Sequence, residues 1–262
     1  MGLASHLILR LRDDRVLAPS VAARRLLART VLRLGQDSGL LAFRAADTHL
    51  HAVALVEEAA GRQLARRIEI ALVRGMGLPI GFAPARVLPV RDQPHLVNLF
   101  GYILGQARHH GLEPDALHEA GNLPDLLGMR LAGAYTVPRV REHLPRLRRG
   151  DLLRHLGLDT LPEHPLAWEG LADAAAAAVG LPSLEGRTEP IVAARRAAVH
   201  AAREALSTEQ TALRLGLSAR AVTRMRSEVA DPALILAIRR QLAVREALGE
   251  EVGRSMMLAE AG

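Results

Sequence analysis

Hydrophobic and polar positions follow two different periods along the first 110 residues. Segments whose apolar positions fit strands are 6–12, 40–46, 49–56, 79–82 and 86–90. Segments whose apolar positions recur every three to four residues, as in amphipathic helices, are 20–34, 57–74 and 94–109. The order strand–helix–strand–strand–helix–strand–helix predicts an α+β fold, with a ferredoxin-like antiparallel sheet and helices on one face.

From residue 112 onward the pattern changes. Residues 112–165 contain many prolines and predict short helices, whereas residues 166–250 are almost wholly helical in pattern. We therefore predict a first domain over 1–115, a helical linker over 116–165 and an all-α C-terminal region over 166–262.

Residues 207–226 predict a helix-turn-helix within the C-terminal region. Ser207 is a suitable N-cap, Gly216 ends the first helix and Ser218 caps the second. An ordinary helical hairpin would have the same pattern, but the basic charge of the chain favours DNA binding. The side chains of the second helix predicted to meet DNA are Arg220, Thr223, Arg224 and Arg226.

The charge of the chain favours a polyanionic partner. The formal net charge is +6, and all 34 basic residues are arginine. Arginine suits phosphate contacts, although a GC-rich genome would give the same bias. Because aromatic residues make up only 2% of the chain, base stacking is not expected to dominate nucleic-acid binding.

Other features of the composition exclude several classes of protein. The chain has no cysteine, which excludes disulfides and thiolate metal sites. No apolar run approaches the roughly 18–20 residues that cross a bilayer, and the N-terminus does not have the pattern of a signal peptide. These observations predict a cytoplasmic protein without a membrane partner.

One group of residues predicts chemistry. Tyr102 and Gln106 are four apart in the helix predicted over 94–109, so both are expected on one helix face. His49 and His51 are two apart in a predicted strand and therefore share one face of the sheet. Two imidazoles, an amide oxygen and a phenol would make a metal site with a nucleophile beside it.

Each of these residues also has an ordinary explanation. The histidines would serve as one core and one surface residue, or both would serve only in hydrogen bonding. Tyr102 would be an amphipathic core residue and Gln106 an exposed helix residue. Tyr135 is the alternative nucleophile, but it has no metal-type partner at helical spacing and precedes a proline-containing loop.

Taken together, the residues resemble the HUH single-tyrosine transposases, and especially the REP-associated tyrosine transposases. The resemblance is carried by His49-Leu50-His51, Tyr102-Ile103 with Gln106, and the basic segment that ends in Gly111. It extends over roughly residues 5–130 and includes the stretch before the helix, where Arg86 and Arg91 are predicted to contact DNA.

The resemblance implies cleavage and rejoining of single-stranded DNA, at a hairpin or a repeat-associated sequence. It also implies a homodimer. Tyr102 would form a 5′-phosphotyrosine, and His49, His51 and Gln106 would hold Mg²⁺ or Mn²⁺. Two alternatives remain open. One is a domesticated DNA-binding protein with little or no activity, and the other is a metal-dependent phosphoesterase that uses water as its nucleophile.

Overall fold

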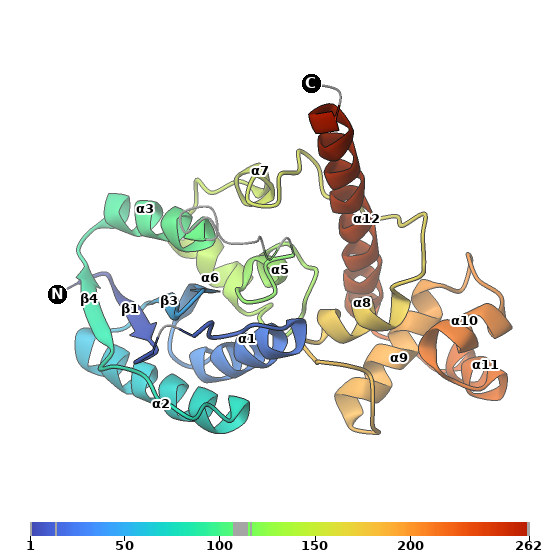
Figure 1. Ribbon diagram of the computed structural model, residues 1–262, viewed down its shortest axis with the longest axis horizontal. Helices are drawn as coiled ribbons and strands as arrows, with labels where there is room; N and C mark the ends of the chain where they lie inside the picture. Colours follow the sequence, from blue (N-terminus) through green and yellow to red (C-terminus); the bar gives the residue numbers. More distant parts are fainter. Residues whose placement is uncertain (1, 14, 107–114, 116, 261–262) are drawn as a thin grey trace. The chain divides into compact units, whose positions relative to one another are not determined.

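The computed structural model describes residues 2–13, 15–106, 115 and 117–260 (Figure 1). The chain divides into two compact units. The first unit comprises Met1–Leu127 and Ala132–His155, and the second comprises Gly128–Leu131 and Leu156–Gly262. The segment predicted as a linker, 116–165, is therefore shared between the two units.

The first unit is built on a four-stranded sheet with every neighbouring pair antiparallel. Its strands are β1 (Ala4–Arg10), β2 (Leu40–Ala46), β3 (His49–Ala54) and β4 (Arg86–Val90), in the order β2-β3-β1-β4. Helix α1 (Val21–Gly35) connects β1 to β2, and α2 (Glu58–Met76) connects β3 to β4. The predicted α+β class and ferredoxin-like strand order are confirmed. The extended segment expected at 79–82 contributes only a single bridge, between Leu11 and Phe82.

The two faces of this sheet differ in character. Leu7 and Leu9 of β1 belong to a hydrophobic core that also includes residues of α1 and α2, whereas His6 and Arg10 alternate with them and face the other way. Helix α3 (Gln93–Leu104) contacts β2 and β3 on the side of the sheet opposite α1 and α2 (Figure 1). The expectation that the helices lie on one face is therefore wrong for α3.

Local signals set where these helices begin and end. Ser20 caps α1 by accepting a hydrogen bond from the amide of Ala23 at 3.2 Å. Asp92 caps α3 in the same way, accepting from the amide of His95 at 2.9 Å. The helix predicted over 94–109 is interrupted, because α3 ends at Leu104, Gly105 is its C-cap and Gln106 is helical again. Residues 107–109 lie outside the described residues.

Residues 118–122 cover the outer edge of β2. The amide of Ala45 donates to the carbonyl of Ala120 at 2.9 Å, and the Asn122 side chain bonds both the Phe43 amide (3.0 Å) and the Leu41 carbonyl (2.9 Å). Gly121 is required here, because a Cβ would lie 2.9 Å from the Phe43 carbonyl oxygen. These bonds give partners to backbone groups of β2 that would otherwise be unpaired at the edge of the sheet. The short helices α5 (Leu123–Leu126), α6 (Thr136–His143) and α7 (Arg149–Leu153) complete the described part of this unit.

A buried ion pair joins this edge segment to α1. Nε and Nη2 of Arg25 both donate to Oε1 of Glu119, at 2.9 and 2.7 Å, and both side chains are buried. Breaking such a pair is costly because it leaves an uncompensated charge in the interior.

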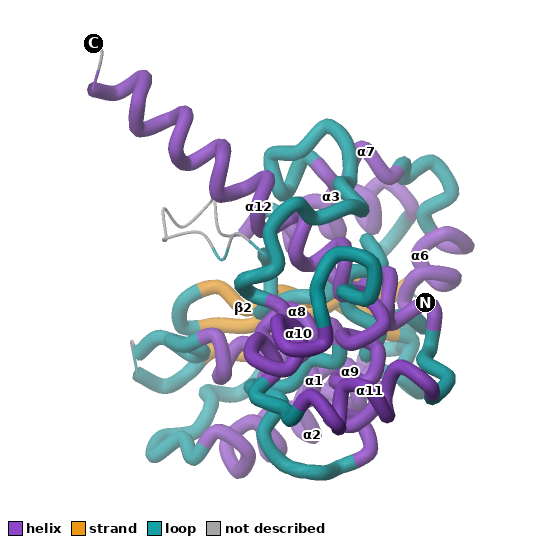
Figure 2. The backbone as a smooth tube through the Cα atoms, turned by 90° about the vertical axis from the view of Figure 1, so that its right-hand side faces the viewer, coloured by secondary structure: helices purple, strands orange, loops and turns teal. Residues whose placement is uncertain are grey.

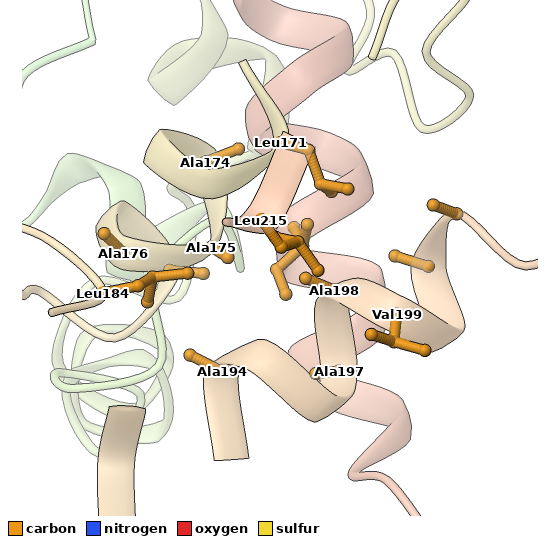
Figure 3. Close-up of a cluster of buried hydrophobic side chains, with 14 of the residues drawn as sticks. Leu171, Ala174, Ala175, Ala176, Leu184, Ala194, Ala197, Ala198, Val199 and Leu215 are labelled. Atoms are coloured by element: carbon orange, nitrogen blue, oxygen red, sulfur yellow. The ribbon is translucent and has the colours of Figure 1, made fainter. Parts of the chain in front are cut away.

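The described elements of the second unit are all helices, as predicted for the C-terminal region. They are α8 (Leu171–Ala178), α9 (Glu189–Ala201), α10 (Thr208–Leu215), α11 (Ala219–Ser227) and the continuous α12 (Pro232–Glu260) (Figure 2). Alanines of α8 and α9 supply much of the core, together with leucines such as Leu171 and Leu215 (Figure 3). Because an alanine side chain is a single methyl group, these helices can approach closely. Within the described part of the chain, no helix combines the length and apolarity that a membrane crossing requires.

Replacing Arg25 with methionine tests the buried ion pair. We expect Arg25→Met to lower the free energy of unfolding of the first unit by about 3–5 kcal/mol, because Glu119 would remain buried and unpaired. The double variant Arg25→Met/Glu119→Leu should recover most of the loss. Chemical denaturation followed at amide resonances of the first unit gives both values, and equal stability of the single variant and the wild type would contradict this role.

Candidate active site

Histidines of two neighbouring strands lie on the sheet face that α3 occupies. His49 and His51 come from β3 and His6 from β1. The His51 ring lies edge-on to His49, with centroids 4.8 Å apart, and is stacked with His6 at 5.2 Å. Nε2 of His6 and Nδ1 of His51 are 2.9 Å apart, so one of them donates a hydrogen bond to the other. Because Nδ1 of His51 is engaged by His6, the nitrogen of His51 that would bind a metal is Nε2.

Tyr102 of α3 meets this group at His51. The two rings are perpendicular, with an interplanar angle of 90° and centroids 5.6 Å apart. Tyr102 is 41% exposed, so its ring is accessible to a large substrate while it contacts the histidine. The structure therefore brings together three of the residues singled out from the sequence, His49, His51 and Tyr102.

His6 was not among the residues selected from the sequence. The alternation in residues 6–12 places His6 on the face opposite Leu7, which was the available signal. The sequence near His6 does not show that His51 is its partner, because the two residues belong to different strands. Burial lowers the pKa of His6 to about 4, with smaller contributions in the same direction from His95 and Arg86. His6 is therefore neutral near pH 7, which suits a hydrogen bond between two imidazoles.

Gln106 lies beyond the end of the helix that carries Tyr102. Gly105 stands between them and has left the α-helical conformation, with φ −84° and ψ 2°. The side chain of Gln106 is completely buried. Because α3 ends before Gln106, its spacing of four from Tyr102 does not by itself place it beside the histidines. Its role as a third metal ligand stays a prediction.

The histidines supply part of the donor set that a divalent metal would need. Among the residues that the structure describes, no three His, Cys, Asp or Glu side chains form a metal-binding group. A site made from His49, His51 and an amide oxygen lies outside that class of group, since only two of its ligands are histidines. The binding of Mg²⁺ or Mn²⁺ by these residues stays a prediction.

Arginines flank the histidines on the same face of the sheet. Arg10 lies directly across from His49 in the pairing of β1 with β3, and Arg86 lies across from Ile8 in the pairing of β1 with β4. Both arginines are exposed. Arg91 is also exposed, just before α3, and its backbone amide donates to Nδ1 of His95 at 3.4 Å. Arg86 and Arg91 were predicted as DNA contacts. Arg10 was missed, because only the register of β1 against β3 places it beside His49.

Tyr135 has a different environment from Tyr102. Its hydroxyl donates to the carbonyl of Leu32 at 2.7 Å, and Arg139 lies 4.9 Å above its ring. Burial raises the pKa of Tyr135, and the nearby carboxylate of Asp125 adds to this effect. A phenol that is held as a hydrogen-bond donor and resists ionisation is a poor nucleophile.

In the second unit, α10 and α11 are joined by the short turn 216–218. Ser207 and Ser218 cap the two helices through their hydroxyls, and Gly216 ends α10 in the left-handed conformation with φ 62°. These helix bounds agree with the predicted ones, whereas DNA binding by the hairpin stays a prediction.

The four polar residues predicted to meet DNA from α11 do not all point outward. Arg220, Thr223 and Arg224 are exposed. Arg226 is half-buried and donates to Oγ1 of Thr208 at 3.1 Å and to the carbonyl of Leu206 at 2.9 Å. Arg226 therefore joins α11 to the start of α10.

No family model matches this chain, and no curated protein does. The chain is similar to one solved structure, described as the structure of the REP associates tyrosine transposase bound to a REP hairpin. The identity is 18%, the TM-score is 0.37, and the match covers 43% of this chain and 70% of that one.

The lowered pKa of His6 makes the stability of the first unit sensitive to acid. Above pH 6.5 His6 is neutral in both the folded and the unfolded chain. Between pH 6.5 and about 4 only the unfolded chain takes up the proton. We therefore expect the free energy of unfolding to fall by up to about 3 kcal/mol over this range, with no further loss below it.

The matched variant is His6→Gln, which keeps a hydrogen-bonding group but does not titrate. Its free energy of unfolding should fall less than that of the wild type between pH 6.5 and about 4. Denaturation should be followed at amide resonances of β1, because the single tryptophan, Trp168, belongs to the second unit and reports on it instead. Identical pH profiles for the two proteins would show that His6 is not the group responsible.

Proposed function

We propose that the first unit is a metal-dependent nickase and strand transferase acting on single-stranded DNA, with Tyr102 as its nucleophile. The observation that carries the proposal is the contact of the Tyr102 ring with His51, at 5.6 Å and 90°, on a face that also holds His49 and His6. A partly exposed phenol beside an imidazole cluster suits nucleophilic attack on a polymer, because an adjacent base activates the hydroxyl.

The proposed reaction exchanges one phosphodiester for another. The Tyr102 oxygen bonds to phosphorus, the bond from phosphorus to the 3′ oxygen breaks, and the phenolic proton is balanced by the proton gained on the released 3′-hydroxyl. A divalent metal, when bound by His49, His51 and Gln106, would polarise the scissile phosphate and offset its developing charge. Because the 5′-phosphotyrosine keeps the energy of the phosphodiester, rejoining requires no nucleotide cofactor.

The chain's own residues would position the strand. Arg10 and Arg86 lie beside the histidines on the same face and are exposed, which suits contacts to backbone phosphates on either side of the scissile bond. His6 would hold the orientation of His51 through the 2.9 Å hydrogen bond, as outer-shell partners of metal-binding histidines do.

The second unit would bind DNA separately through α11. Arg220 and Arg224 are exposed on this helix, whereas Arg226 is engaged in fastening it to α10. A hairpin or repeat-associated target and a homodimer are parts of the same proposal that rest on the motif resemblance.

The decisive experiment for Tyr102 is a search for a covalent protein–DNA adduct. With labelled single-stranded oligonucleotides and Mn²⁺, we expect an adduct that survives denaturation. Tyr102→Phe should abolish it, because only the nucleophilic oxygen is removed. Tyr135→Phe is the matched control: it should cost about 1 kcal/mol of stability through its lost hydrogen bond to Leu32 and leave the adduct unchanged.

Two other outcomes would replace the proposal. Cleavage that persists in Tyr102→Phe without any adduct would indicate a phosphoesterase that uses water. Binding without cleavage, under any divalent metal, would indicate a DNA-binding protein without activity.

A pair of arginine variants tests DNA binding by α11. Arg224→Ala should weaken binding to all sequences and reduce the slope of log Kobs against log salt by about 1, because one phosphate contact is lost. Arg226→Ala should instead lower the unfolding temperature of the second unit, which Trp168 fluorescence reports. An unchanged salt slope in Arg224→Ala would count against recognition by this helix.

A further inference from the structure

A second candidate site in the first unit lies around Arg44, which is almost entirely buried yet incompletely bonded. Arg44 is 2% exposed, and its Nε and Nη1 have no hydrogen-bond partner among the described residues. Burial lowers its pKa, and the positive charge of Arg24 acts in the same direction, whereas Asp115 opposes them. A buried guanidinium with unpartnered donors destabilises a fold, so the arrangement requires a physical reason.

The unpartnered arginine lines a cavity. The cavity has a volume of about 250 Å³, which is far more than one water molecule needs. Arg24, in the first turn of α1, also lines it, as do Asp47 and Asp115. The cavity is therefore polar on several sides, with two arginines in its wall.

Both carboxylates belong to segments whose bonds hold the cavity in shape. Oδ2 of Asp115 accepts from the amide of Ala120 at 2.8 Å, and its Oδ1 lies 3.8 Å from Nη1 of Arg24. Asp47 is in the turn between β2 and β3, and its backbone carbonyl accepts from the amide of Leu17 at 2.8 Å. Asp115 is thus occupied by a backbone amide and Arg24, and Arg44 has the unused donors.

Arg44 also has a defined relation to the histidine face. Arg44 on β2 pairs directly with His51 on β3, so the two side chains leave the sheet on the same side, from strands about 4.8 Å apart. A polyanion that places one phosphate at His49 and His51 would have further phosphates within a short distance of Arg44.

We propose that this cavity binds a phosphate group, with Arg44 as its principal ligand and Arg24 as the second. A phosphate presents oxygens that accept hydrogen bonds and a negative charge that compensates the buried guanidinium. If the first unit acts on single-stranded DNA as proposed above, the phosphate belongs to the backbone of that strand. A free phosphate compound is the other source of the same chemistry.

Arg44→Met separates a binding role from a structural one by the sign of its effect. Methionine fills a similar volume without a charge, so in phosphate-free buffer we expect Arg44→Met to raise the unfolding temperature of the first unit. Arg25→Met is the matched control, because Arg25 is equally buried but bonded to Glu119, and this variant should lower the same temperature. A fall in Arg44→Met like that in Arg25→Met would overturn the proposal in favour of a structural role.

Ligand binding is measured with inorganic phosphate on the full chain, at constant ionic strength held with chloride. We expect phosphate at about ten times its Kd to raise the unfolding temperature by about 3–6 °C and to shift the Nε–H resonance of Arg44. Arg44→Met should lose both effects. Arg24→Gln should weaken phosphate binding by about 10- to 100-fold, and it provides a second measurement at a more accessible position.

Binding of a single-stranded oligonucleotide, measured for the wild type and for Arg44→Met, identifies the source of the phosphate. If Arg44→Met weakens binding of single-stranded DNA and reduces its salt slope by about 0.7, the phosphate comes from the DNA backbone. If free phosphate binds but DNA binding is unchanged, the ligand is a small phosphate compound. Equal binding of both ligands by the wild type and Arg44→Met would overturn the proposal. Running every arm in Tyr102→Phe protein keeps these results independent of whether Tyr102 forms an adduct.

Discussion

The antiparallel pairing of β1 with β3 at the centre of the sheet is the constraint on which the candidate active site depends. Its register sets Ile8 opposite His51 and Arg10 opposite His49, so that His6, His51 and Arg10 share one face. Because side chains alternate along a strand, a slip of one residue would move His6 and Arg10 into the apolar layer under α1 and α2. The leucines that alternate with them prevent this slip, since they fill that layer. The hydrophobic core thereby holds the polar face in position.

Two buried arginines of the first unit show how differently the same side chain can be used. Arg25 gives two hydrogen bonds to Glu119 and joins α1 to the segment that covers β2. Arg44 lies on the covered strand itself and has donors without partners beside a cavity. In the first case the charge is compensated within the fold. In the second the compensation would come from a ligand, at some cost in stability to the empty protein.

The hairpin of α10 and α11 separates residues that stabilise a helix from residues that are available to a partner. Arg226 is of a residue type that commonly contacts DNA, but its side chain joins α11 to the start of α10. Arg220 and Arg224 remain at the surface of the same helix. Helical spacing shows which residues share a face, but whether an arginine reaches outward depends on acceptors brought near by the fold.

The sequence by itself determined the order of strands and helices, the caps at Ser20, Ser207 and Gly216, and the shared face of His49 and His51, because these follow from periodicity and local hydrogen bonds. Only the tertiary structure decided that α3 lies on the face opposite α1 and α2, which brings Tyr102 to His51. It also decided that α3 ends before Gln106, and that His6 and Arg44 adjoin His51. The reason is that strand register and the packing of helices arise between segments far apart in the chain, whose contacts leave no local pattern.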